Sequence, residues 1–125
     1  MRLRSPASLN LILSDYPDSS IAWRKRTAVA TAKAVLAGEL GLIEGCVALS
    51  QVAHGLVPRW HDDPDFLVFG SVASETDHLP TGSARTHWNP DALAREDQRI
   101  AQYEAKARTD IVAACQNIIA RFGDA

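Results

Sequence analysis

The run SVASETDHLPTGSARTHW, residues 71–88, places side chains that could do acid–base or metal chemistry within a few positions of one another. Glu75 and His78 are three residues apart, so a helix would put them on one face, where a carboxylate and an imidazole can share a metal ion. A dimetal centre in a helical bundle needs two such pairs with further carboxylates on facing helices, and the chain has one Glu-x-x-His. We therefore predict no metal and no cofactor, and keep a metal-assisted hydrolase that uses Glu75, Asp77 and His78 as an alternative.

A structural role for the same run is the stronger interpretation. If the preceding helix buries Ala73, Asp77 follows on the same face and becomes half-buried, and a buried charge needs a partner. Arg85 is close enough along the chain to clamp the Asp77 carboxylate through two hydrogen bonds. We predict a polar staple of Asp77 and Arg85, with Glu44 from an earlier helix as its third member.

Catalysis lacks its local sequence signals. The chain contains no G-x-S-x-G turn, no HExxH helix motif and no glycine-rich loop that would hold a phosphate. Glu75 and Asp77 are two residues apart, so a helix points them in different directions and they do not form an acid–base pair. No residue is predicted to be catalytic, and the sequence favours a protein that is not an enzyme.

Two charged runs are candidate contact surfaces. The run HDDPD contains Asp62, Asp63 and Asp65, of which Asp63 also suits the N-cap of a helix that Pro64 opens. The run WRKR, residues 23–26, lies in the first turns of a predicted helix, where the helix dipole disfavours cations. It is a solvated face, or it forms ion pairs with HDDPD, or it binds an acidic partner. The predicted binding residues are Asp62, Asp63, Asp65, Glu75, His78, Arg24 and Arg26.

Composition limits the classes of function. The chain has 125 residues, of which 46% are apolar, and a net charge of −2 with a pI near 6.0. Proteins that bind nucleic acid usually carry a basic excess, so nucleic acid is an unlikely partner. No apolar run approaches the ~18 residues of a membrane span. Cys46 and Cys115 fall among apolar neighbours, which is typical of reduced, buried thiols. We expect a cytoplasmic protein without a membrane partner.

Hydrophobic periodicity predicts helices over almost the whole chain. Residues 7–13 form a short first helix, and a second helix follows from Ser19 or Ser20 to about residue 37. Apolar residues at spacings of three and four predict a third helix over residues 40–56, and a second face of small residues suits close packing of a neighbour.

The last two segments complete the predicted fold. The fourth segment starts at the cap Asp63, and its residues 66–73 suit a helix or a strand. The last helix is predicted from its cap, Asn89, to Gly123. A helix of ~50 Å needs at least two others to cover it. We therefore predict an all-α fold, an antiparallel bundle of four to five helices with a long C-terminal helix, in a single domain of residues 1–125.

Three segments carry a resemblance to known sequences. They are GLIEGCVAL, FGSVASETDHLPTGSARTHW and AACQNIIARF, which lie within residues 23–122. In these segments the chain is similar to an uncharacterised family of small stand-alone bacterial helical domains. The resemblance implies a bacterial origin and a self-contained fold, and it transfers no activity and no site residues.

The small size, the mildly acidic charge and the lack of a catalytic motif favour a binding module. We expect a protein partner and, more specifically, an immunity protein that neutralises a bacterial toxin by covering its active site. Its acidic residues would then meet a basic surface of the toxin. The alternatives are the metal-assisted hydrolase and a structural or oligomerisation domain that self-associates through the last helix.

Overall fold

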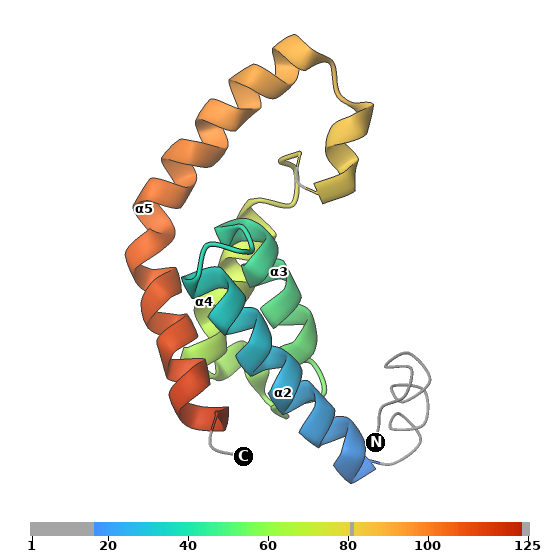
Figure 1. The fold of residues 1–125 in the computed structure, drawn as a ribbon, viewed down its shortest axis with the longest axis vertical. Coiled ribbons are helices and arrows are strands. Elements are labelled where there is room, and N and C mark those ends of the chain that lie inside the picture. The colour runs from blue at the N-terminus through green and yellow to red at the C-terminus, as the bar shows by residue number, and fades with distance from the viewer. Residues whose placement is uncertain (1–16, 81, 124–125) are drawn as a thin grey trace.

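The structure is a computed structural model that describes residues 17–80 and 82–123. The helices in this part of the chain are α2 (Pro17–Leu36), α3 (Leu42–Ala53), α4 (Pro64–Glu75) and α5 (Pro90–Phe122), with short 3-10 helices η1 (Trp60–Asp62) and η2 (Gly82–His87). Consecutive α-helices run in opposite directions (Figure 1). The predicted all-α antiparallel bundle with a long last helix is therefore confirmed, and the predicted helix over 7–13 lies outside the described residues.

Two helix starts follow the local rules of capping. The Asp63 carboxylate accepts a hydrogen bond from the Asp65 backbone N–H at 3.0 Å, and Pro64 follows as the first residue of α4. The Asn89 side chain accepts from the backbone N–H groups of Asp91 and Ala92 at the start of α5. Both caps were predicted. The segment 66–73, which suited a helix or a strand, is helical.

Other helix ends differ from the prediction by a few residues. α2 begins at Pro17 rather than at a serine cap, because proline fits the first turn, where its missing N–H needs no partner. Gly38, with φ of 77°, turns the chain after α2, a conformation that costs glycine little. α3 ends at Ala53, and Gly55, with φ of 102°, makes the next turn.

One apolar core joins the four helices. The predicted apolar stripe of α3 is buried at Leu42, Cys46, Leu49 and Ala53. On the predicted small face of the same helix, a Cβ atom at Gly45 would overlap the Val35 side chain of α2. The observed packing of α2 against α3 therefore requires glycine at position 45.

The last helix is covered along only part of its length. α2, α3 and α4 have 20, 12 and 12 residues against the 33 of α5, which at 1.5 Å per residue is about 30, 18 and 18 Å against about 50 Å. Its buried residues fall between Ile111 and Ile118, and Ile100 is its first apolar residue that packs against the core among those described. The expectation that at least two other helices cover α5 is confirmed, because α2, α3 and α4 all pack against it. The first turns of α5 extend past these helices (Figure 1).

Both cysteines are buried in this core as free thiols. Burial raises the pKa of the Cys46 thiol to about 12 and that of Cys115 to about 11. We expect neither thiol to react with dithionitrobenzoate at pH 8 in the folded protein, and both to react at once in denaturant, because the thiolate is the nucleophile. Fast reaction of either thiol without denaturant would contradict this placement.

Among the helices of residues 17–80 and 82–123, none combines the length and the hydropathy that a membrane span requires.

Candidate functional site

The structure does not gather the acidic and histidine side chains of residues 75–78 into a site. The Glu75 carboxylate points to α5, where the Tyr103 hydroxyl donates a hydrogen bond to it at 2.5 Å. Asp77 and His78 are exposed, and 3.9 Å separates the Asp77 Oδ1 from the His78 Nδ1. No group of three or more histidine, cysteine, aspartate or glutamate side chains in the described residues could hold a metal ion. A hydrolase that uses Glu75, Asp77 and His78 on one metal therefore has no geometric support.

The predicted staple between Asp77 and Arg85 was wrong. The Asp77 side chain is 79% exposed, and the buried position at the end of α4 belongs to Thr76, whose hydroxyl donates to the Val72 carbonyl at 2.7 Å. Arg85 instead donates two hydrogen bonds to Asp97 of α5, at 2.7 and 3.0 Å. Arg85 pairs with Asp97 because α5 is long. Its first turns extend past the ends of the other helices and place the Asp97 carboxylate beside η2.

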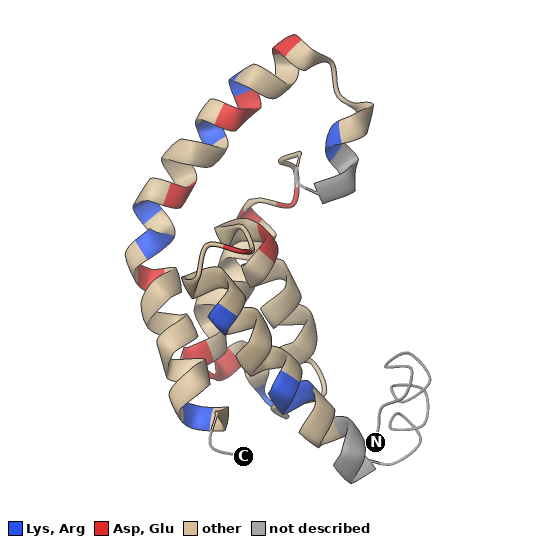
Figure 2. Cartoon of the chain, viewed as in Figure 1, with Lys and Arg blue, Asp and Glu red and all other residues tan. Residues whose placement is uncertain are grey.

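Glu44 lies in the same region without belonging to a staple. Its charge contributes to the raised pKa of Arg85, after the larger effect of the hydrogen bond to Asp97. The pKa of Glu104 on α5 is raised by burial and then by Glu44, so these two carboxylates lie near each other. Acidic residues gather where α3 begins and α4 ends (Figure 2).

The Arg85–Asp97 pair links η2 to the first half of α5, and we expect it to hold that half in place. Arg85 holds the pKa of Asp97 below its usual range, so the link persists at neutral pH and is lost as pH falls through that lowered pKa. We predict that Asp97→Asn speeds hydrogen exchange in the first turns of α5 and leaves global Tm nearly unchanged. Asp77→Asn, the matched control, should alter neither quantity. Equal exchange in both variants would contradict the link.

The acidic run before α4 is held by a partner that sequence reasoning missed. Arg121, in the last turn of α5, donates to both Asp63 oxygens at 3.0 and 2.9 Å and to Asp65 at 3.0 Å. Asp62 receives a hydrogen bond at 2.8 Å from the exposed Arg59. The signal for Arg121 was a cation in the last turn of one helix and carboxylates in the first turn of another, which antiparallel packing brings together.

The basic run in α2 is divided between two environments. Arg24 donates to the Val52 carbonyl at 3.4 Å and lies over Gly55, at the C-terminal end of α3. The negative end of the α3 dipole favours a cation there. Because α2 begins at Pro17, Arg24 lies beyond the first turn of its own helix, where the dipole that disfavours cations has little effect. Arg26 is exposed and lines a hollow with Lys33 and Phe122. Ion pairs with HDDPD, one of the alternatives for this run, do not form among the described residues, where Asp62, Asp63 and Asp65 pair with Arg59 and Arg121 instead.

One side of α4 carries an exposed apolar residue between two hollows. Leu67 is 47% exposed, and Ser71 and Glu75 follow it at four-residue spacing along α4. We call this row and the hollows on either side of it the α4 surface. This surface was not predicted from the sequence. Its signal would have been the four consecutive apolar residues 66–69, because a helix cannot turn all four to one core.

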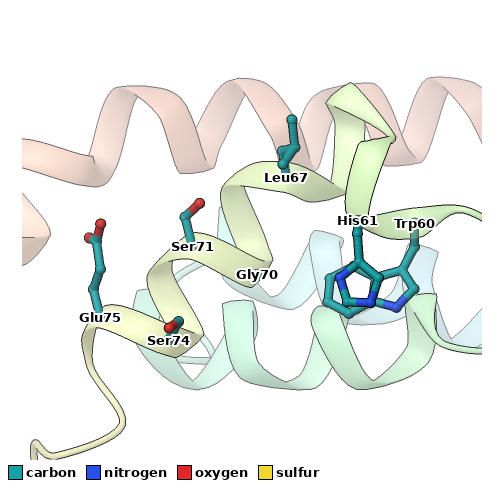
Figure 3. Close-up of a pocket in the computed structure, with 7 residues that line it drawn as sticks. All are labelled: Trp60, His61, Leu67, Gly70, Ser71, Ser74 and Glu75. Carbon is teal, nitrogen blue, oxygen red and sulfur yellow. The ribbon is translucent and has the colours of Figure 1, made fainter.

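The first hollow lies between the row and η1, and we call it the tryptophan hollow. It has a volume of about 500 Å³ and is lined by Trp60, His61, Gly70 and Ser74 together with the row (Figure 3). The Trp60 and His61 rings lie against each other at a tilt of 34°, with centroids 4.0 Å apart. A Cβ at Gly70 would come within 2.9 Å of the Trp60 ring, so glycine makes room for it.

The second hollow lies between the row and α5, and we call it the α4–α5 groove. Its volume is about 510 Å³. On the α5 side it is lined by Tyr103, Lys106, Ala107 and Asp110. The Glu75–Tyr103 hydrogen bond crosses from one helix to the other at one end of the groove.

Serine, histidine and glutamate all line the tryptophan hollow, but they do not form a nucleophilic triad. His61 lies at one end of the hollow beside Trp60, and Ser71 and Ser74 lie towards the other end, next to Glu75 (Figure 3). A nucleophile and its base need to approach within about 3.2 Å, with a third group that orients the base. The residues of the tryptophan hollow therefore lack the geometry that activates a serine hydroxyl, and they form an open concave surface instead (Figure 3).

A family model described as a protein of unknown function, DUF2489, matches residues 28–118. The chain belongs to this family. The match extends from α2 into the last turns of α5 and includes the whole α4 surface. The predicted resemblance to an uncharacterised family is confirmed. No curated protein and no solved structure matched the chain.

Proposed function

We propose that this protein is a protein-binding module that docks its partner on the α4 surface. The observation that carries the proposal is Leu67, 47% exposed between two open hollows of about 500 and 510 Å³. A single exposed leucine is ordinary on a protein surface. A leucine between two hollows is different, because a partner can surround it with apolar side chains and exclude water from it.

The energetics of this surface favour contact with another protein. Full burial of a leucine side chain contributes roughly 1.5–3 kcal/mol, and Leu67 has about half of its surface still to bury. The tryptophan hollow adds further apolar surface for a partner, because the Trp60 ring lies against Gly70 in its lining.

The more specific form of the proposal is an immunity protein that covers the active site of a bacterial toxin. Its support is the charge around the α4 surface. Glu75 lies in the row, Asp110 lines the groove, and Asp77 is exposed just beyond the end of α4. A basic toxin surface would complement these carboxylates, which raises the rate of association and disfavours acidic competitors.

Leu67→Lys tests the proposal, because it removes the apolar contact and places a cation where a basic partner would approach. The wild-type chain is used as bait in cells of the organism that encodes it, and the recovered partner is purified and titrated against each variant by calorimetry. We expect Leu67→Lys to weaken binding about tenfold or more. Leu36→Lys is the matched control, because Leu36 is 38% exposed on another helix, and it should bind as wild type does.

The specific form has its own readout in cells. The recovered partner should stop growth when expressed alone, and co-expression of the wild-type chain should restore growth where Leu67→Lys does not. A partner that is harmless would remove the immunity role and leave the binding module. Equal affinity of wild type, Leu67→Lys and Leu36→Lys would remove the α4 surface as the docking site.

A further inference from the structure

The α4–α5 groove has the dimensions of a seat for one short helix. Its α4 wall extends from Leu67 to Glu75 and its α5 wall from Tyr103 to Asp110. These stretches are eight and seven residue steps long, which is about 12 and 10 Å at the rise of an α-helix. A groove of two turns between antiparallel helices accepts side chains that lie one turn apart on a third helix.

The floor of the groove is apolar and its edges are polar. Val72 is buried, and Val68 and Ala107 are partly buried against the same core. Ala107 is the small residue of the α5 wall, so it leaves room for a side chain from outside. Polar edges with an apolar floor are the pattern of a groove that receives the apolar face of an amphipathic helix.

The charged edge of the groove specifies the sign of its occupant. Glu75 and Asp110 bring two carboxylates and Lys106 one ammonium group, so the edge has an excess of negative charge. Glu75 is also held in place, because its Oε1 accepts the hydrogen bond from the Tyr103 hydroxyl. A carboxylate held in this way loses less side-chain entropy when it binds a cation, and its Oε2 can receive a second donor.

We infer that the α4–α5 groove binds an amphipathic helix of a partner protein, with two apolar side chains one turn apart over Val68, Val72 and Ala107 and a lysine or arginine against Glu75. This inference rests on the proposed docking function, and it adds which side of Leu67 is used and what the partner presents there. The tryptophan hollow then remains at the edge of the contact.

Two substitutions, each of which fills one of the two hollows, distinguish binding in the groove from binding in the tryptophan hollow. Ala107→Leu adds bulk to the groove alone, and Ser74→Leu adds similar bulk to the tryptophan hollow alone. The probe is a displayed library of 18-residue helical peptides randomised on one face, panned on the full chain. Circular dichroism and Tm verify that each variant is folded before binding is measured.

The inference predicts enriched peptides with apolar residues at i and i+4 and a lysine or arginine one turn beyond. Their affinity should fall about tenfold or more with Ala107→Leu and with Glu75→Lys, and should hold with Ser74→Leu and with the exposed-loop control Glu39→Lys. Peptides without this pattern, or no enriched peptide, would overturn the inference.

The remaining outcomes distinguish this inference from the proposed function. Loss of binding with Ser74→Leu and not with Ala107→Leu would overturn the groove and leave the α4 surface as the docking site. If none of Ser74→Leu, Ala107→Leu and Leu67→Lys changes the binding affinity, both the groove and the α4 surface are overturned as docking sites. A chain that dimerises in light scattering, and loses the dimer with Ala107→Leu, would assign the groove to a second copy and overturn the partner helix.

Discussion

Gly45→Ala should lower the free energy of unfolding by about 1–3 kcal/mol, although alanine is the better helix former. A methyl group at this position would overlap the Val35 side chain, which is 5% exposed in the contact between α2 and α3. Valine is β-branched and holds one rotamer in a helix, so it cannot turn aside. The two helices would have to separate along a contact that contributes to the core. Urea denaturation followed by circular dichroism measures the loss.

A double-mutant cycle isolates the overlap from other effects. Val35→Ala removes the methyl groups that alanine at position 45 would meet. In that background Gly45→Ala should be neutral or should stabilise the fold by up to ~1 kcal/mol, because only the gain in helix propensity remains. A loss of the same size in both backgrounds would show that α2 and α3 do not meet at these residues.

Arg121→Met should cost about 1.5–3 kcal/mol, the range of hydrogen bonds to charged groups. Arg121 donates to Asp63 and Asp65 of α4 from the last turn of α5, and the Asp63 side chain is 11% exposed. Methionine keeps most of the apolar stem, so the change removes the cation while preserving packing. The carboxylate that caps α4 would be left poorly solvated without its partner.

Thermal and urea denaturation measure the loss of stability in Arg121→Met. The control is Arg59→Met, measured in the same way. Arg59 also contacts an aspartate of this run, but its side chain is 84% exposed and that of Asp62 is 67% exposed. Exposed pairs contribute little, so Arg59→Met should change stability by less than about 1 kcal/mol. Equal losses in the two variants would indicate that Arg121 contributes no more than a surface charge.

Local sequence signals were sufficient where a single turn decides the structure. Asp63 with Pro64, and Asn89 with Pro90, marked two helix starts because capping depends on neighbours within three residues. The helical class of the fold followed from the periodicity of apolar residues.

The polar contacts between helices could not be predicted from local sequence. Arg121 and Asp63 are 58 residues apart and Tyr103 and Glu75 are 28 apart, so only the packed fold brings them together. The Asp77–Arg85 staple failed for a related reason. A shift of one residue turns a helical side chain by about 100°, and Thr76 rather than Asp77 takes the buried position.

The α4 surface was visible in the sequence only as an excess of apolar residues. Phe66 and Phe69 are buried in the core while Leu67 between them faces outward. Which of the four apolar residues at 66–69 faces solvent depends on where α3 and α5 lie, which the pattern in one helix does not contain.

The most direct test of binding through the α4 surface is photocrosslinking in living cells of the organism that encodes the protein. A benzophenone side chain placed at Ser71, which lines both hollows of the α4 surface, should capture one discrete protein on irradiation. The same group at Ala30, exposed on α2 beside Arg26 and Lys33, should capture none. A discrete product at Ala30 with none at Ser71 would contradict the claim that this protein binds its partner through α4.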